Sequence, residues 1–194
     1  MKRIFDFTVA FIGLFLLIPI ILLIAIIVKL SSKGPIFFIQ SRVGYNARLF
    51  KIIKFRSMLV VQESESTISV KGDVRVTKVG IVLRKYKLDE IPSLWNVLVG
   101  DMSFVGPRPD VPGYADQLVG ENRKILKLRP GITGPATLKY SNEEDLLAKQ
   151  NNPEKYNNEI IYPEKVRINL DYYKNHNLWI DIKIIFATIF RNTY

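Results

Sequence analysis

The chain has 194 residues, enough for one domain with a buried core, and it contains no cysteine, which excludes disulfides and thiolate metal sites. Lysine and arginine number 28 against 18 acidic residues, so the formal net charge is +10. A charge of this size indicates an anionic partner, namely nucleic acid, acidic lipid or a phosphorylated substrate, and composition does not choose among the three.

Residues 7–28 form an apolar run of about the length that one helix needs to cross a bilayer. A secretory signal peptide fits poorly, because the run is long and no small-residue cleavage site follows it. Lys2 and Arg3 precede the run, and Lys29 and Lys33 follow it. Positive charge at both ends gives no preferred orientation across a membrane.

Pro19, near the middle of this run, must interrupt the helical hydrogen-bond ladder, and each half reaches about one leaflet deep. Two arrangements are consistent with the residues: a kinked helix that spans the membrane, or a re-entrant helix that enters and leaves on one face. Asp6 is expected to act as an interfacial cap or to pair with a nearby base. Gly34 and Pro35 end the helix, and the globular part of the chain begins there.

Two short strands are expected next, at residues 36–39 and 50–55, with residues 41–46 as a hairpin connection. Lys54 and Arg56 stand two positions apart in an extended segment. Their side chains are therefore expected to point to the same side, as a phosphate clamp requires. A sheet edge protected by lysine is at least as common a reason for such a pattern.

Residues 60–77 are polar and rich in Ser and Glu, and we interpret them as a mobile loop that could act as a lid over the site. Arg75 lies in a strand-like alternation at the end of this loop. Residues 79–86 are expected to form a helix that carries Arg84 towards the next segment.

Residues 88–98 contain two adjacent acids, Asp89 and Glu90, with basic residues on both sides. We expect one helix here, with Asp89 as its N-cap, Pro92 in its first turn and an apolar face that includes Trp95. Both acids then lie at the positive end of the helix dipole, which favours their ionised forms and draws a metal ion or phosphates nearby. An ordinary capped helix start is the alternative.

Two arginines lie in rigid turns downstream of this helix. Prolines on both sides of Arg108 hold the backbone extended and fix the direction of the guanidinium, which suits the capture of a phosphate. Arg129 precedes Pro130 and a glycine-rich turn in a second segment of this kind. A purely structural turn is the alternative in both places.

Helices are expected over residues 142–150, 163–174 and 178–190. The last has a strongly apolar face that includes Trp179, which suits a helix lying on the bilayer surface or one facing the core. His176, the only histidine, lies at a helix junction, and we expect it to be a cap and not a general base.

Six segments in a fixed order resemble the bacterial sugar transferase family, the monotopic phosphoglycosyl transferases that begin polysaccharide and glycoprotein glycan assembly. They lie at residues 34–44, 54–58, 73–77, 88–98, 100–109 and 129–134. The resemblance runs from the membrane segment to about Gly134, and the compact length is similar to that of the small single-domain members.

The resemblance implies an α/β fold, in which surface or interfacial helices surround a small sheet in a compact membrane-associated domain. Residues 1–33 would form a re-entrant membrane helix bent at Pro19, because the family's helix is re-entrant. Residues 34–140 would form the catalytic region, and residues 141–194 the C-terminal helices, partly at the membrane interface and packed on the same domain.

The family's activity transfers a sugar phosphate from a nucleotide diphosphate sugar, usually a UDP-sugar, to undecaprenyl phosphate, and yields undecaprenyl-diphosphate-sugar and UMP. The resemblance places it in the bacterial inner membrane, with the active site facing the cytoplasm. Carried over to this sequence, Asp89 is the nucleophile that forms an aspartyl-phosphosugar intermediate, and Glu90 helps to hold Mg²⁺. The basic candidates for substrate phosphates are Lys54, Arg56, Arg75, Arg84, Arg108 and Arg129. Residues 135–140 depart from the family pattern, so the sugar is not carried over.

A nucleic-acid-binding protein is disfavoured, because the basic residues lack a recognition helix or aromatic platform and the apolar N-terminal run fits it badly. A membrane-anchored nucleotide-sugar phosphohydrolase and a non-catalytic basic membrane adaptor remain as alternatives. The expected partners are a nucleotide diphosphate sugar, undecaprenyl phosphate and membrane lipid, and the sequence leaves a homodimer open.

Overall fold

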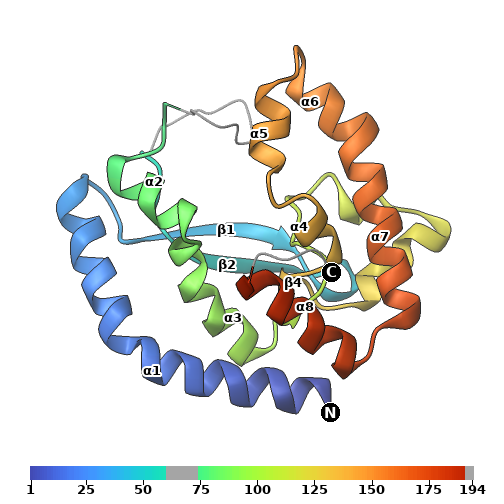
Figure 1. The fold of residues 1–194 in the computed structure, drawn as a ribbon, viewed down its shortest axis with the longest axis horizontal. Helices are drawn as coiled ribbons and strands as arrows, with labels where there is room; N and C mark the ends of the chain where they lie inside the picture. The colour runs from blue at the N-terminus through green and yellow to red at the C-terminus, as the bar shows by residue number, and fades with distance from the viewer. Residues whose placement is uncertain (60–73, 191–194) are drawn as a thin grey trace.

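The computed structural model describes residues 1–59 and 74–190. Figure 1 shows helices arranged around two small sheets, with the long helix α1 along one side and α7 on the opposite side. Residues 60–73 lie outside the described residues. They include most of the predicted lid loop and the first residue of the 73–77 segment. The described part confirms a mixed fold of helices and small sheets.

Helix α1 (Lys2–Ser31) has 30 residues, with Pro19 inside it. Figure 1 shows it curving around the side of the molecule that carries α2 and α3. Its buried residues are confined to two short stretches near its ends, Asp6 with Ala10 and Ile24 with Val28, and most of its apolar side chains are exposed. By length and composition it could cross a membrane.

The first turn of α1 is tied to the body of the protein by its charged side chains. Arg3 donates to the carbonyls of Val97 and Leu98 at 2.5 and 2.6 Å, which satisfies the free C-terminal carbonyls of α3. Asp6, only 2% exposed, accepts from the backbone N–H of Phe104 at 3.2 Å. Asp6 therefore satisfies a backbone N–H of β3 (Ser103–Val105), and within residues 1–59 and 74–190 it forms no ion pair with a base.

The opposite end of α1 is held by Arg56, which is 4% exposed. Its Nη2 donates to the carbonyls of Val28 at 3.3 Å and Ser32 at 2.6 Å. A cation at these carbonyls also complements the negative end of the helix dipole. Both ends of the exposed apolar helix are therefore bound to the same globular body.

Strands β1 (Phe37–Val43) and β2 (Leu49–Phe55) form an antiparallel hairpin in which Phe37 pairs with Phe55 and Val43 with Leu49. The prediction of two strands is confirmed. The connection is shorter than the expected 41–46, because residues 41–43 continue the ladder and the short 3-10 turn η1 (Tyr45–Ala47) closes it.

Helix α2 (Lys78–Lys85) confirms the helix predicted over residues 79–86, and the Thr77 hydroxyl caps it by accepting from Gly80 N at 2.8 Å. Gly80 also lies against the preceding segment, since a Cβ there would stand 1.9 Å from the carbonyl oxygen of Ser57. The close approach of these two backbones fixes where α2 starts.

The single helix predicted from Asp89 onwards is wrong. The segment forms a 3-10 helix, η2 (Leu88–Ser93), followed by α3 (Leu94–Val99). Lys87, with φ of 57°, occupies the position before η2, so Asp89 lies inside the first turn and is not the N-cap.

The apolar face predicted for this segment is confirmed at Ile91 and Leu98, which pack against apolar clusters, and wrong at Trp95. Trp95 is 51% exposed, while Asn96 is buried. Asn96 accepts from Ile53 N at 3.1 Å and donates to Lys51 O at 2.8 Å. These two bonds hold α3 against the backbone of β2 and turn Trp95 outwards.

Strands β3 (Ser103–Val105) and β4 (Gly131–Thr133) pair in parallel, and both fall in segments that were expected to be turns. Glycine permits this arrangement: a Cβ on Gly131 would lie 2.2 Å from the backbone nitrogen of Gly106. Two 3-10 helices, η3 (Ala115–Gln117) and η4 (Gly120–Lys127), connect the strands, and α4 (Pro135–Lys139) follows them.

The C-terminal third is helical, as predicted. It comprises α5 (Glu143–Ala148), α6 (Pro153–Tyr156), a π-helical turn η5 (Asn157–Ile161), α7 (Tyr162–Asn175) and α8 (Leu178–Phe190). His176 occupies the C-cap of α7, with its Nδ1 2.8 Å from the carbonyl of Tyr173, which confirms the predicted cap.

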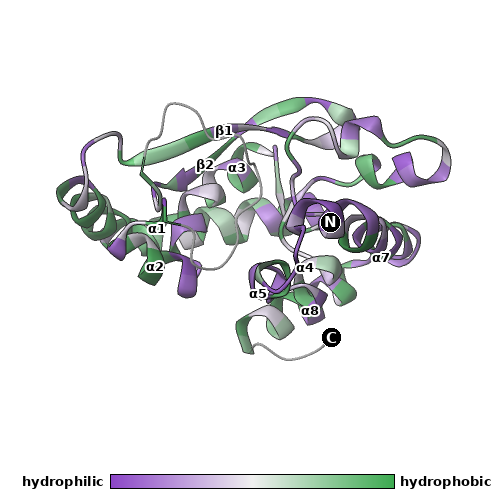
Figure 2. Cartoon of the chain, turned by 90° about the horizontal axis from the view of Figure 1, so that it is seen from above, coloured by the Kyte–Doolittle hydropathy of each residue, from purple (hydrophilic) through white to green (hydrophobic). Residues whose placement is uncertain are grey.

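Helix α8 buries Asp181, Ile184 and Ala187 and exposes much of the predicted apolar face. Trp179 is 68% exposed and Phe186 55%. Figure 2 shows hydrophobic residues along α1 and on α8. The sequence allowed a helix on the bilayer surface or one facing the core, and the structure shows much of the apolar face pointing outwards.

Candidate active site

The candidate site is a pocket of about 320 Å³, open to solvent, where β1, β2 and η2 meet the segment after β3. It is lined by Arg42, Ile52, Lys54, Glu90, Ser93, Met102, Arg108, Pro109, Gly131 and Ile132. Among these side chains three are cationic and one is anionic.

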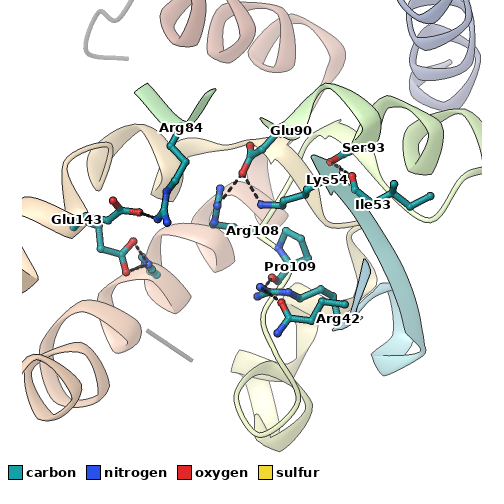
Figure 3. Close-up of polar contacts among 12 residues, drawn as sticks. Arg42, Ile53, Lys54, Arg84, Glu90, Ser93, Arg108, Pro109 and Glu143 are labelled. Atoms are coloured by element: carbon teal, nitrogen blue, oxygen red, sulfur yellow. Dashed lines mark hydrogen bonds and ion pairs between the residues drawn. The ribbon is translucent and has the colours of Figure 1, made fainter. Parts of the chain in front are cut away.

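Glu90 is at the centre of the polar contacts in this pocket (Figure 3). Its Oε1 accepts from Lys54 Nζ at 2.7 Å and from Arg108 Nη2 at 3.0 Å. Burial by itself would raise the pKa of the Glu90 carboxyl, but the charges of Arg108 and Lys54 outweigh it and hold the pKa well below its usual range. Glu90 is therefore ionised at neutral pH.

Asp89, the adjacent acid, has a different environment. Its residue is 9% exposed, its side chain does not line the pocket, and its Oδ1 is buried without a hydrogen-bond partner in the described part of the chain. Burial, followed by the charge of Glu90, raises the pKa of Asp89, and the charges of Lys54, Lys87 and Arg84 oppose that rise. Two neighbouring carboxyls with separated pKa values are suited to different chemical roles.

Ser93 and Arg84 fix the surroundings of the two acids. The Ser93 hydroxyl donates to the Ile53 carbonyl at 3.1 Å, so η2 is bound to β2 directly beside Lys54. The guanidinium of Arg84 reaches across to the Glu144 carboxylate of α5. Figure 3 shows Arg84 on the α5 side of the site, next to Glu143.

The structure brings together only part of the predicted site. Lys54, Glu90 and Arg108 are in contact, and Asp89 and Arg84 stand beside them. Lys54 and Arg56 do not form a common clamp, because Arg56 is turned to the end of α1.

The remaining two predicted basic residues do not line the pocket. Arg129 donates through Nε to Gly100 O at 2.8 Å and stands over the ring of Tyr45 at 5.3 Å, and it does not line the pocket. The carbonyl of Arg75 accepts from Leu59 N at 2.8 Å, which joins the two sides of the segment that precedes α2. The functional roles assigned to Arg56, Arg75 and Arg129 stay predictions.

Residues 1–193 match the family described as "Bacterial sugar transferase". The chain belongs to the bacterial sugar transferase family. Curated relatives include a UDP-glucose:undecaprenyl-phosphate glucose-1-phosphate transferase of Klebsiella pneumoniae, which is 40% identical over 195 residues. Another is the UDP-N-acetylgalactosamine-undecaprenyl-phosphate N-acetylgalactosaminephosphotransferase of Aeromonas hydrophila, 39% identical over 196 residues.

These relatives are longer than the chain. The match covers 98% of this chain but 39% of the Klebsiella protein, and 97% of this chain but 42% of the Aeromonas protein. The exopolysaccharide production protein PSS of Rhizobium leguminosarum bv. phaseoli is similar in length, since the match covers 97% of this chain and 93% of that protein, at 35% identity. The sugar transferase region therefore occurs both alone and as part of longer chains.

A metal ion in this sugar transferase would have few protein ligands. No group of three or more acidic or histidine side chains that could hold a metal occurs within residues 1–59 and 74–190. The two contacts of Glu90 both use Oε1, so Oε2 takes part in neither and is available to a metal ion. This donor set fits Mg²⁺, which proteins commonly hold through one or two carboxylates together with substrate phosphates and water.

Sequence reasoning missed Arg42, which lines the pocket, and Asp110, which interacts with Arg42 from outside the lining. Arg42 lies in the 34–44 segment that carries the family resemblance, but it had been assigned to a hairpin connection. Asp110 follows Arg108 and Pro109, and burial raises its pKa to about 6 against the charges of Lys165 and Arg42. No local pattern marks Arg42 as a pocket residue, because Lys54, Glu90 and Arg108 are distant from it in sequence.

Proposed function

We propose that the protein transfers a sugar phosphate from a nucleotide diphosphate sugar to undecaprenyl phosphate and releases a nucleoside monophosphate. The observation that carries this proposal is the contact of Glu90 with Lys54 and Arg108 directly beside Asp89. The activities for which these two relatives are named, with glucose or N-acetylgalactosamine as the sugar, support a UDP-sugar donor and UMP as the nucleotide product. They do not decide which sugar this chain uses.

Asp89 is proposed as the nucleophile. A carboxylate oxygen of Asp89 attacks the β-phosphorus of the donor, an aspartyl O–P bond forms, and the P–O bond to the α-phosphate breaks, so that UMP leaves with the electron pair. An oxygen of the lipid phosphate then attacks the same phosphorus and releases the Asp89 carboxylate. The absence of a hydrogen-bond partner at Oδ1 suits this role, since the lone pairs of the nucleophile are not engaged.

Lys54 and Arg108 are proposed to offset the charge of the two anionic substrates, which a carboxylate alone would repel. In the structure both cations are oriented by Glu90, so they are in place before the substrate arrives. Mg²⁺, held by Glu90 together with the substrate phosphates, would neutralise charge on the phosphates and the leaving nucleotide.

The site is proposed to face the cytoplasm at the surface of the inner membrane, with α1 as a re-entrant helix. A straight helix of 30 residues would measure about 45 Å, longer than the hydrocarbon core of a bilayer. Because both ends of α1 bind the same polar body, through Arg3 and Arg56, the ends are expected on one side of the membrane. The exposed apolar face of α8 would lie at the same interface.

The test is release of UMP from a panel of UDP-sugars, with and without undecaprenyl phosphate, by the full chain in detergent or vesicles. Lipid-dependent release is expected for at least one sugar, with a lipid-linked sugar as product. Asp89→Asn should lower turnover by at least about 10³-fold and remove the phosphosugar adduct from the peptide that contains residue 89. Asp171→Asn, at an exposed acid on α7, is the matched control.

Other outcomes point to the alternatives. Free sugar phosphate as the product, formed without lipid, would indicate a phosphohydrolase. A protein that binds membranes normally but releases UMP from no sugar in the panel would indicate an adaptor.

A further inference from the structure

Arg42 is a cation in the pocket to which neither the family resemblance nor the reaction above gives a role. It comes from β1, whereas Lys54 comes from β2 and Arg108 from the segment after β3. Figure 3 shows Arg42 beside Pro109, on the side of the site away from Arg84. Arg42 therefore extends the positively charged side of the pocket that Lys54 and Arg108 form.

The guanidinium of Arg42 is held in place by two uncharged acceptors. Its Nη1 donates to Pro109 O at 3.1 Å and its Nη2 to the Gln40 side-chain oxygen at 2.6 Å. Its Nε is buried and has no hydrogen-bond partner in the described part of the chain. A guanidinium has five N–H groups, so these two bonds fix its plane and leave donors for another ligand.

The charge of Arg42 is not cancelled within the pocket. Glu90, the one acidic residue of the lining, is already bonded to Lys54 and Arg108, so the lining carries an excess of two positive charges. Arg42 and Arg108 line the same pocket, and Arg42 is bonded to the carbonyl of Pro109, the residue that follows Arg108. Burial, and next the charge of Arg108, lower the pKa of Arg42. Asp110 attracts Arg42 from outside the lining.

We propose that Arg42 binds the nucleotide sugar, and that the guanidiniums of Arg42 and Arg108 together bind its diphosphate. This inference rests on the proposed function. Two adjacent guanidiniums match two adjacent phosphates, each able to take a planar pair of N–H donors. The diphosphate of a nucleotide sugar carries two negative charges, the same as the excess of positive charge in the lining. The lipid phosphate carries a similar charge but has a single phosphate group, so it lacks the second phosphate that a second guanidinium would bind.

The experiment measures binding of inorganic pyrophosphate, which carries the diphosphate without base or sugar, and of orthophosphate, which represents a monophosphate. The full chain in detergent micelles is titrated calorimetrically as wild type, Arg42→Gln, Arg42→Lys and Arg123→Gln. Arg123 is the matched control, because its guanidinium likewise makes two bonds to uncharged acceptors, the carbonyls of Asp116 and Leu118, but on the exposed surface.

Arg42→Gln should weaken pyrophosphate binding at least about tenfold and change orthophosphate binding by less than about threefold, with Arg42→Lys in between. Arg123→Gln should match the wild type. In the transferase assay, Arg42→Gln should raise the KM for the nucleotide sugar by a similar factor and leave the KM for undecaprenyl phosphate within about twofold. Equal pyrophosphate affinity in Arg42→Gln and wild type, or a rise confined to the lipid KM, would overturn the proposal.

A double variant separates binding from positioning, since Arg42 also holds the carbonyl of Pro109 next to Arg108. If Arg42 contacts the diphosphate, Arg42→Gln still weakens pyrophosphate binding in the Arg108→Gln background. No further loss in that background would overturn direct contact.

Lipid-dependent transfer with an unchanged pyrophosphate affinity in Arg42→Gln refutes only the role of Arg42. Arg42-dependent pyrophosphate binding without any transfer refutes the proposed function and retains the diphosphate site.

Discussion

At the scale of single residues, the pocket separates two adjacent carboxyls by their surroundings. Glu90 has two cationic partners at 2.7 and 3.0 Å and a lowered pKa, whereas Asp89 has a raised pKa and an oxygen without a partner. The difference follows from the tight 3-10 geometry of η2, which directs successive side chains to different sides. Glu90 can therefore bind the cations of the pocket while the adjacent Asp89 acts as the proposed nucleophile.

Asp110 gives a prediction about pH and stability at this scale. Its pKa of about 6 lies above the ordinary value of 3.8, so the folded state favours the protonated form. Its contribution to the stability of the fold therefore declines as the pH rises from about 4 to about 6. Asp110→Asn should raise the free energy of unfolding at pH 7.5 by about 1–2 kcal/mol, less than the full shift implies because the residue is partly exposed, and change it little at pH 4.

The measurement is thermal or chemical unfolding of the full chain in detergent at both pH values, with Asp171→Asn as a control at an exposed acid. A variant that is less stable than the wild type at pH 7.5 would show that attraction to Arg42 and Lys165 outweighs the cost of burial. The present assignment of the raised pKa to burial would then be wrong.

At the scale of elements, helix α1 is defined by its two anchored ends. An apolar helix that is mostly exposed gains free energy by entering lipid, while its ends stay with the polar body through Arg3 and Arg56. The proline in its middle lowers the free-energy cost of bending there, because one backbone hydrogen bond is already absent.

The topology of α1 is testable because the natural chain has no cysteine. A cysteine inserted after Met1 and, in a second variant, Lys33→Cys should both react with a membrane-impermeant thiol reagent from the cytoplasmic side of oriented vesicles. Ile18→Cys, next to Pro19, should be protected in intact vesicles and serves as the control for membrane depth. Labelling of the two end positions from opposite sides would establish a spanning helix.

At the scale of the whole molecule, the N-terminal turn of α1 joins parts of the chain that are far apart in sequence. Lys2 donates to Val105 O at 3.0 Å and pairs with Asp181 of α8 at 2.5 Å. Asp181 is 1% exposed and also accepts from the hydroxyl of Tyr172. The membrane helix is thus part of the core that supports β3 and α8.

Removing the charge of Lys2 should therefore destabilise the entire domain. Lys2→Met leaves the buried carboxylate of Asp181 without its cation, which should lower the free energy of unfolding by about 2–3 kcal/mol. Lys29→Met is the matched control at the other end of α1, where the ammonium makes only an exposed bond to Gly34 O at 3.3 Å. Equal melting temperatures of the two variants in the same detergent would contradict this role.

Much of the fold followed from local patterns. The apolar run 7–28, the two strands of the hairpin and helices α2, α7 and α8 could be predicted, because periodicity and end signals act over a few residues. The same patterns failed at residues 88–98, where bonds from Asn96 to β2 outweighed the apolar periodicity and left Trp95 exposed. They also failed at β3 and β4, whose three-residue pairing depends on a close approach between Gly106 and Gly131.

The candidate site divides in the same way. The sequence alone determined that Asp89 and Glu90 lie together among basic residues, since adjacency in the chain is itself the signal. Only the tertiary structure decided which cations lie beside them. Lys54 and Arg108 form ion pairs with Glu90, whereas Arg56 is hydrogen-bonded to the C-terminal end of α1. Arg42 is held in the pocket by its bond to the carbonyl of Pro109, 67 residues away in the chain. No local sequence pattern can predict a contact between residues so far apart.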